Sequence, residues 1–224
     1  MQKYAIIVAG GSGSRMGSEI PKQFLPINNK PILFHTVEKF LQIPELQVIL
    51  VLPKKDIEYW NSLEKPVSLQ SNQLTITEGG ASRFQSVKNG LKLVPQDADL
   101  VAVHDGVRPL ISLEIIQNSF TVAAEKGSAV TSVMLKDSAR RILENGDNEA
   151  IDRTQYRLMQ TPQTFKVSIM KPAFEAPEQS FFTDCASVLE YAGHKITLIE
   201  GSYENIKITT PEDLVLAEAF IKNV

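Results

Sequence analysis

The 224-residue sequence has little of what several classes of protein require. Its single cysteine, Cys185, excludes an internal disulfide, and its three histidines (His35, His104 and His194) lie too far apart in sequence to suggest a zinc motif. The 23 Lys and Arg stand against 26 Asp and Glu, a net charge of −3, so no overall positive field would attract nucleic acid. Any binding of phosphate groups must therefore be local, and burial of apolar side chains must hold the fold together.

Long apolar runs are missing as well. Residues 5–9 are apolar and follow Met1 almost directly, without a cleavable signal, and no run reaches the roughly 20 apolar residues of a membrane span. We therefore expect a cytoplasmic protein that makes no contact with a membrane. Because the sequence has no internal repeat, low-complexity tract or Gly/Ser linker, residues 1–224 are expected to form a single domain.

The apolar residues that are present form short segments of two kinds. Residues 4–9, 48–52 and 100–103 are rich in Val and Ile and do not alternate with polar residues, which is typical of strands covered on both faces. Residues 33–41 and 84–94 show helical periodicity, and Thr210 and Pro211 give a start signal for a C-terminal helix. This alternation predicts an α/β fold with a doubly wound, mostly parallel sheet.

One segment, residues 137–155, is mostly polar and charged and carries the turn sequence Asn145-Gly146-Asp147 at its centre. The turn predicts a protruding β-hairpin arm. A hairpin with so little apolar surface is marginal by itself, so a second subunit is the simplest surface for it to pack on. The alternative is a solvated loop.

A glycine-rich segment, residues 9–17 with the sequence AGGSGSRMG, directly follows the first predicted strand. Glycines let backbone N–H groups converge on an anion, and a loop at the carboxyl end of a parallel strand opens into the usual ligand crevice. The glycine spacing matches neither the dinucleotide fingerprint nor the Walker pattern. The loop instead offers Arg15, and Lys22 beyond it, as two cations that would flank one phosphate chain and stabilise charge on departing pyrophosphate. A glycine turn with two surface cations is the alternative.

Two further clusters follow predicted strands. The sequence from Glu78 to Ser86 places paired glycines before a helix, so that a flat base can approach the backbone and Ser86 can hydrogen-bond its edge. The sequence from His104 to Pro109 places Asp105 and Arg108 at the same crevice. Asp105 suits a contact to magnesium or ribose, and its alternative role is to cap the turn before Pro109.

With these motifs assembled, the chain closely resembles the 2-C-methyl-D-erythritol 4-phosphate cytidylyltransferase family over almost its whole length. The motifs that carry the resemblance are residues 9–16, Pro21-Lys22-Gln23, residues 104–109, Ile151-Asp152-Arg153, Thr161-Pro162-Gln163 and Asn205-Ile206-Lys207. It implies a homodimer in which the arm of residues 137–155 crosses to the partner and helps to complete its active site. It also implies CTP and a polyol phosphate as substrates, with Mg²⁺ accompanying CTP.

The resemblance further implies individual roles. Arg15 and Lys22 would stabilise the transition state, and Arg153 and Lys207 would position the substrate phosphate. The other residues that the resemblance places at the site are Asp105, Arg108, Ser138 and Thr161 for the substrate, and Ala9, Gly10, Gly11, Gly13, Gly80, Ala81 and Ser86 for the nucleotide. Asp105 is also the candidate magnesium ligand.

The chain departs from the common family pattern at three of its positions. Ala81 and Cys185 stand where an acid is frequent, and Ser138 stands where threonine is usual. Ala81 removes a side-chain contact to cytosine and leaves the backbone and Ser86 to discriminate the base, whereas Ser138 keeps the hydroxyl. Two other functions remain open: a ribitol 5-phosphate cytidylyltransferase with the same chemistry, and a module that senses CTP without turning it over.

Overall fold

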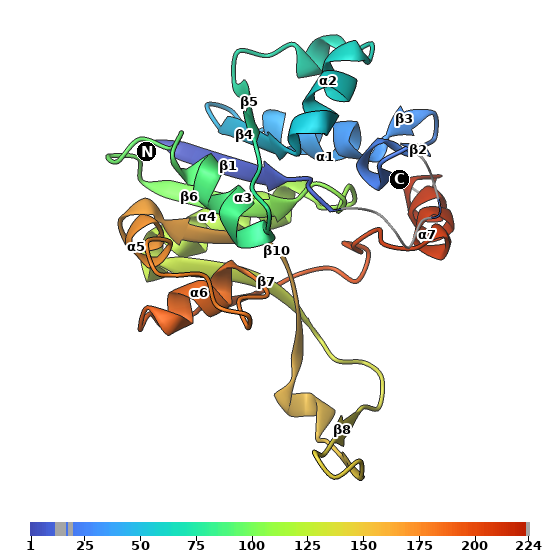
Figure 1. The fold of residues 1–224 in the computed structure, drawn as a ribbon, viewed down its shortest axis with the longest axis vertical. Coiled ribbons are helices and arrows are strands. Elements are labelled where there is room, and N and C mark those ends of the chain that lie inside the picture. Colours follow the sequence, from blue (N-terminus) through green and yellow to red (C-terminus); the bar gives the residue numbers. More distant parts are fainter. Residues whose placement is uncertain (12–16, 18–19, 223–224) are drawn as a thin grey trace.

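The computed structural model describes residues 1–11, 17 and 20–222, so the predicted site residues Gly13 and Arg15 lie outside the described residues. A seven-stranded sheet with the order β11-β7-β10-β6-β1-β4-β5 forms the centre of the molecule (Figure 1). Its strands are β1 (Lys3–Val8), β4 (Gln47–Leu52), β5 (Leu74–Glu78), β6 (Leu100–Asp105), β7 (Ser128–Met134), β10 (Arg157–Lys166) and β11 (Leu198–Glu200). Only β10 runs antiparallel to its neighbours, β6 and β7, so the prediction of a mostly parallel sheet is confirmed.

Helices cover both faces of this sheet, as a doubly wound fold requires. The helices are α1 (Ile32–Leu41), α2 (Lys54–Ser62), α3 (Arg83–Leu91), α4 (Leu113–Lys126), α5 (Val167–Ala173), α6 (Cys185–Tyr191) and α7 (Pro211–Lys222). Alternate residues of β1 separate the two cores: Ile7 packs with side chains of α1 and α4, whereas Ile6 packs with side chains of α3, α5 and α6. Both faces of the strand are therefore buried, which explains its unbroken apolar sequence.

The helix that begins at Pro211 also forms as predicted. The Asp213 carboxylate accepts hydrogen bonds from the backbone N–H groups of Thr209 (2.8 Å) and Thr210 (2.9 Å), which ties down the start of α7. Ala217 is buried in a small third core beside the short strands β2 (Pro26–Ile27) and β3 (Lys30–Pro31). None of the described helices combines the length and apolar content that crossing a membrane demands.

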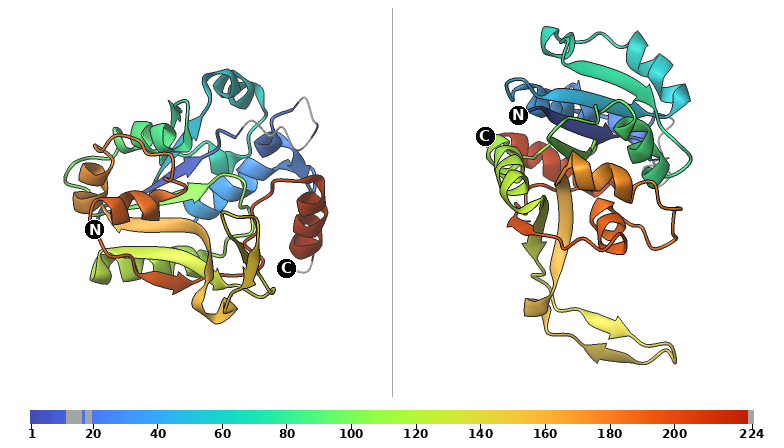
Figure 2. Two further views of the ribbon diagram at one scale, coloured as in Figure 1. Left: turned by 60° about the horizontal axis from the view of Figure 1, so that its bottom comes forward. Right: turned by 90° about the vertical axis from the view of Figure 1, so that its left-hand side faces the viewer.

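The predicted hairpin arm forms as well. Strands β8 (Arg140–Ile142) and β9 (Asn148–Ala150) pair antiparallel, and Gly146 adopts a positive φ of 87° in the turn between them. Every residue of these two strands is exposed. The arm extends away from the body of the molecule in both views that show its length (Figures 1 and 2), so it makes none of the packing contacts that hold the central sheet together.

Candidate active site

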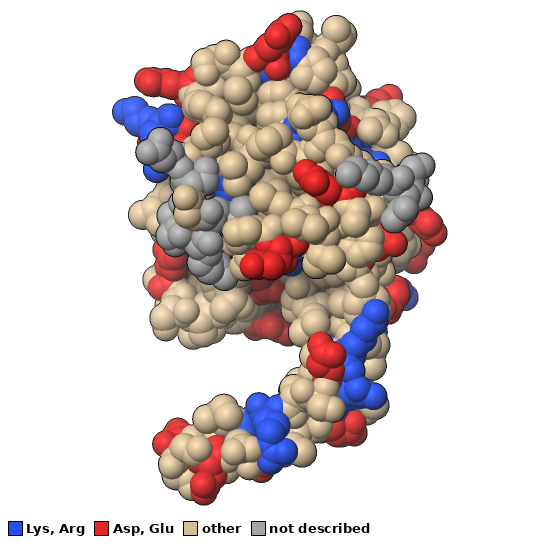
Figure 3. Space-filling model, turned by 90° about the vertical axis from the view of Figure 1, so that its right-hand side faces the viewer, with Lys and Arg blue, Asp and Glu red and all other residues tan. Residues whose placement is uncertain are grey.

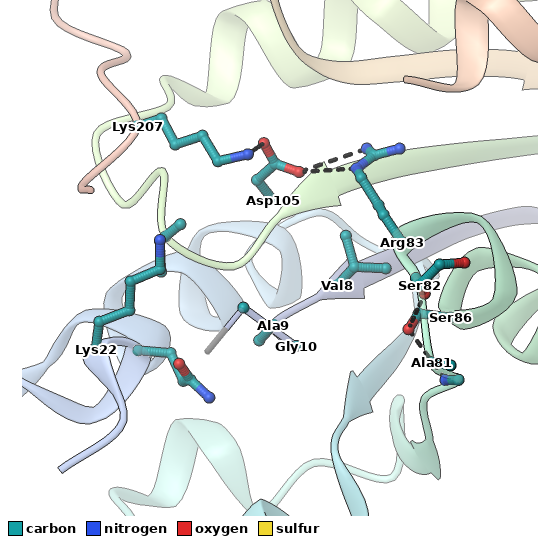
Figure 4. Close-up of a pocket in the computed structure, with 14 residues that line it drawn as sticks. Val8, Ala9, Gly10, Lys22, Ala81, Ser82, Arg83, Ser86, Asp105 and Lys207 are labelled. Atoms are coloured by element: carbon teal, nitrogen blue, oxygen red, sulfur yellow. Dashed lines mark hydrogen bonds and ion pairs between the residues drawn. The ribbon is translucent and has the colours of Figure 1, made fainter. Parts of the chain in front are cut away.

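A cavity of about 310 Å³ lies at the carboxyl ends of the central strands, where loops from β1, β5 and β6 meet (Figure 4). Five segments that are distant in sequence line it: the end of β1, the 3-10 helix η2 (Lys22–Phe24), the turn into α3, the end of β6 with the turn after it, and Lys207 between β11 and α7. Its lining residues are Val8, Ala9, Gly10, Gly11, Lys22, Gln23, Gly80, Ala81, Ser82, Arg83, Ser86, Asp105, Val107 and Lys207. The cavity thus gathers most of the residues predicted from the glycine-rich motifs.

Asp105, the last residue of β6, carries the negative charge at the centre of this cavity. Its Oδ2 atom lies 2.9 Å from Lys207 Nζ and 3.5 Å from Arg108 Nε, and its Oδ1 atom lies 3.4 Å from Arg83 Nη2. Burial opposes ionisation of the carboxyl group, yet Arg83, Lys207 and Arg108 hold the pKa of Asp105 well below its usual range. One carboxylate therefore faces three cations, and this wall of the cavity keeps an excess of positive charge.

Lys22 adds a further cation to the same cavity. It follows Pro21 at the start of η2, it is only 8% exposed, and its Nζ atom donates a hydrogen bond to the carbonyl oxygen of Ile208 at 3.3 Å. Burial limits the positions of the ammonium group, and a phosphate chain in the cavity would meet Lys22 and Lys207 together (Figure 4).

The turn into α3 forms the uncharged side of the cavity. The Ser86 hydroxyl accepts a hydrogen bond from the Gly80 N–H (3.1 Å) and donates one to the Ser82 carbonyl (2.8 Å). Ser82 caps α3 by accepting from Gln85 N at 3.0 Å. A Cβ atom on Gly80 would lie 2.3 Å from Gln85 Cβ, so only glycine fits at this position. The turn is thus held by hydrogen bonds and close packing, and its exposed backbone at Gly80 and Ala81 suits a flat ring.

Two predicted substrate residues lie behind the cavity wall. Arg108 donates to the carbonyl oxygen of Asn205 at 2.7 Å as well as pairing with Asp105. Thr161 is buried, accepts from the backbone N–H of Asp105 at 3.1 Å and hydrogen-bonds the His104 ring at the same distance. In this structure both side chains support Asp105 and neither lines the cavity.

The two predicted residues of the arm, Ser138 and Arg153, are exposed and do not line the cavity of their own chain. Arg153 lies on a 3-10 helix, η4 (Arg153–Gln155), at the base of the arm, where its Nη1 donates to the carbonyl oxygen of Lys136. The structure therefore separates the arm residues from the residues of the cavity.

The sequence motifs predicted no role for three residues that line the cavity: Arg83, Gln23 and Ser82. In the sequence, Arg83 is one basic residue within the glycine motif of residues 78–86, and nothing near it indicates its partners. These partners, Asp105 and Cys185, come from β6 and α6. Cys185 is buried, and burial raises the pKa of its thiol. Asp184 caps α6 by accepting from Ser187 N at 2.9 Å.

The site offers few ligands for a metal ion. Among the residues that the structure describes, no group of three or more His, Cys, Asp or Glu side chains is arranged to hold a metal ion. Both carboxylate oxygens of Asp105, the predicted magnesium ligand, already face cationic side chains. Asp105 is thus poorly suited to direct coordination, because a divalent cation would meet three positive neighbours.

A family model described as "IspD: 2-C-methyl-D-erythritol 4-phosphate cytidylyltransferase" matches residues 4–223. The chain belongs to the IspD family. The resemblance drawn from its motifs is therefore confirmed, and the chain is a nucleotidyltransferase.

Curated relatives and solved structures agree with IspD membership. Two proteins named 2-C-methyl-D-erythritol 4-phosphate cytidylyltransferase are 45% identical (Bacteroides thetaiotaomicron, 99% of this chain and 100% of the relative) and 47% identical (Azobacteroides pseudotrichonymphae, 98% and 99%). The crystal structure of 4-diphosphocytidyl-2C-methyl-D-erythritol synthase from Anaerococcus prevotii is similar with a TM-score of 0.84 at 28% identity, covering 98% of this chain and 96% of that one. The cytidylyltransferase from Thermus thermophilus has a TM-score of 0.78 at 29% identity, covering 99% and 100%. The family does not favour the ribitol phosphate enzyme or the CTP sensor.

Proposed function

We propose that this chain transfers CMP from CTP to 2-C-methyl-D-erythritol 4-phosphate, forming 4-diphosphocytidyl-2-C-methyl-D-erythritol and pyrophosphate in isoprenoid biosynthesis. The observation that carries the proposal is a cavity lined by the cations Lys22, Lys207 and Arg83 together with glycines of two loops, in a chain of the IspD family. We also propose a cytoplasmic location, where free CTP is available, and no nucleic-acid partner, in keeping with the net charge of −3.

The two sides of the cavity suit the two ends of CTP. The proposal places cytosine against Gly10, Gly80 and Ser86, where backbone lies close to the cavity, with the adjacent Ala81 adding no polar side chain. Backbone groups and the Ser86 hydroxyl then recognise the base. The triphosphate extends toward Lys22, along Ala9, Gly11 and Gly13 of the glycine-rich loop.

The proposed chemistry is a direct displacement at phosphorus. A phosphate oxygen of methylerythritol phosphate forms a bond to the α-phosphorus of CTP, the bond from that phosphorus to the bridging oxygen breaks, and pyrophosphate leaves with the electron pair. A phosphate monoester has a second pKa near 6, so it is already ionised at neutral pH and needs no general base. Lys22 and Arg15 stabilise the charge that accumulates on the phosphoryl oxygens and on pyrophosphate.

We propose that Mg²⁺ enters as part of the substrate, bound to the triphosphate of CTP. Magnesium retains several waters and takes few protein ligands at such sites. The crowding of cations around Asp105 supports coordination by phosphate oxygens over direct coordination by this residue. Asp105 then serves the site by holding Lys207 and Arg108 in place.

The proposal includes a homodimer formed through the arm. Arg153 and Ser138 are exposed on or beside an arm that points away from its own cavity, which suits residues that serve a second subunit. Large apolar side chains are exposed on the arm and just after it: Ile142 on the arm is 70% exposed, and Tyr156 and Leu158, which follow the arm, are 47% and 49% exposed. Lys and Arg side chains alternate with acidic ones along the arm (Figure 3), so a partner surface of mixed charge would fit it. In the dimer, Arg153 would position the polyol phosphate in the partner's cavity.

Pyrophosphate release tests the proposed function. Purified protein is incubated with CTP and magnesium, and with either methylerythritol 4-phosphate or ribitol 5-phosphate in parallel. The proposal predicts preferred turnover of methylerythritol phosphate. Preference for ribitol phosphate would retain the mechanism and overturn the substrate, whereas binding of CTP without turnover of either alcohol would favour a sensor.

A further inference from the structure

The Asp105 carboxylate divides its two oxygens between different cations. Lys207 and Arg108 lie against Oδ2, at 2.9 and 3.5 Å. Arg83 lies against Oδ1, with both Nε and Nη2 at 3.4 Å. Arg83 therefore contacts the carboxylate oxygen that the other two cations do not contact.

The Arg83 guanidinium also contacts the protein on the side away from Asp105. Its third nitrogen, Nη1, donates to Cys185 Sγ at 3.5 Å, at the first residue of α6. The start of α6 is in turn tied to β10, because Gln163 Oε1 accepts from the backbone N–H groups of Cys185 (3.0 Å) and Ala186 (3.1 Å). All three nitrogens of Arg83 are thus engaged by protein groups.

The backbone of Arg83 belongs to the other side of the cavity. Arg83 is the first residue of α3 and directly follows the turn of Gly80 and Ser82, which hydrogen bonds to Ser86 hold in place. Its side chain crosses from this turn to the end of β6 (Figure 4). One side chain therefore connects the turn to Asp105.

We infer that Arg83 is a positioning residue of the nucleotide site, which fixes the Asp105 carboxylate relative to the base-binding turn. This inference rests on the proposed function, because it assumes that CTP occupies the cavity. Without Arg83, both remaining cations pull on Oδ2, and the carboxylate turns toward them. Lys207, whose side chain is 41% exposed at the cavity, then shifts with its partner and no longer meets the triphosphate in the same place.

A double-mutant cycle on CTP binding tests the inference. Affinity for CTP with magnesium is measured by calorimetry for the wild-type protein, Arg83→Gln, Asp105→Asn and the double variant. If Arg83 acts through Asp105, Arg83→Gln weakens binding roughly tenfold in the wild-type background but less than about threefold when Asp105 is already Asn. Equal losses in both backgrounds would mean that Arg83 acts on the nucleotide independently, which would overturn the inference.

Two further variants separate positioning from folding. Arg83→Lys keeps the charge but loses the fork that reaches Asp105 and Cys185 together, so it should restore only part of the affinity. Lys88→Gln is the matched control on α3, since Lys88 pairs with Glu175 on the surface, and it should bind CTP as the wild type does. A loss of thermal stability in Arg83→Lys with unchanged affinity would show a purely structural role. Failure of the wild-type protein to bind CTP would instead overturn the proposed function, and this inference with it.

Discussion

Replacing Lys22 with Met removes one buried cation from the cavity. Lys22 is 8% exposed, and Met fills a similar volume, so the change leaves no large cavity. The folded protein loses the hydrogen bond from Nζ to the Ile208 carbonyl, which costs about 1 kcal/mol. For a chain of this size such a loss lowers the melting temperature by about 2–4 °C.

The effect of Lys22→Met on turnover should be much larger. Loss of one charged donor to the transition state costs about 2.7–4 kcal/mol, which lowers kcat by roughly 100- to 1000-fold. Because the ammonium also meets the ground-state triphosphate, we expect a smaller increase in KM for CTP. Both constants follow from pyrophosphate release measured against CTP concentration.

The matched control is Lys54→Met, which removes an exposed lysine at the start of α2 without touching the cavity. It should retain wild-type turnover. A Lys22→Met enzyme with kcat within threefold of the control would refute the transition-state role of Lys22. A Lys22→Met protein that melts far below the control would show instead that the residue matters mainly for folding.

Three other perturbations give distinct outcomes. Gly80→Ala places a Cβ atom 2.3 Å from Gln85 Cβ, so the base-binding turn must move, and CTP affinity measured by calorimetry should fall by about tenfold or more; unchanged affinity would place the base elsewhere. Burial lowers the pKa of His104 from 6.5 to about 4, so the unfolded chain takes up a proton that the folded protein does not. The contribution of His104 to the free energy of unfolding should therefore be fully present above pH 6.5 and fall by about 3 kcal/mol toward pH 4, and urea melts of His104→Gln should lose this contribution while those of the control His194→Gln keep it. Mixing Lys22→Met and Arg153→Ala subunits should restore about a quarter of wild-type turnover. Half of the dimers are mixed, and each mixed dimer has one site with both an intact Lys22 and an intact Arg153 from the partner. No recovery in confirmed mixed dimers would show that Arg153 serves its own chain.

Elements defined by local sequence were predictable. The strands at residues 4–9, 48–52 and 100–103 each correspond to a strand of the central sheet, because both faces of these segments are buried and every residue is apolar or nearly so. The arm was visible from a turn that needs glycine at positive φ. The apolar pattern of residues 84–94 predicted a longer helix than the structure contains. Helix α3 ends at Leu91, and Val94 is buried in the turn that follows it.

Features that depend on distant partners were not predictable. Strand β10 contains the buried polar residues Gln160, Thr161 and Gln163, which hide its strand pattern. These residues are tolerated because their hydrogen-bond partners come from other parts of the chain, such as the start of α6 for Gln163. The role of Arg83 was hidden for the same reason, since its partners Asp105 and Cys185 lie 22 and 102 residues away in sequence.

A crystal structure with CTP and magnesium would show directly whether CTP binds in this cavity with its triphosphate toward Lys22 and Lys207. We expect cytosine against Gly80 and Ser86, and a phosphate oxygen within about 3 Å of Lys22 Nζ. Coordination of magnesium by phosphate oxygens and water would agree with the crowded cations around Asp105. A nucleotide bound outside this cavity, or a triphosphate directed away from Lys22 and Lys207, would contradict the proposed nucleotide site.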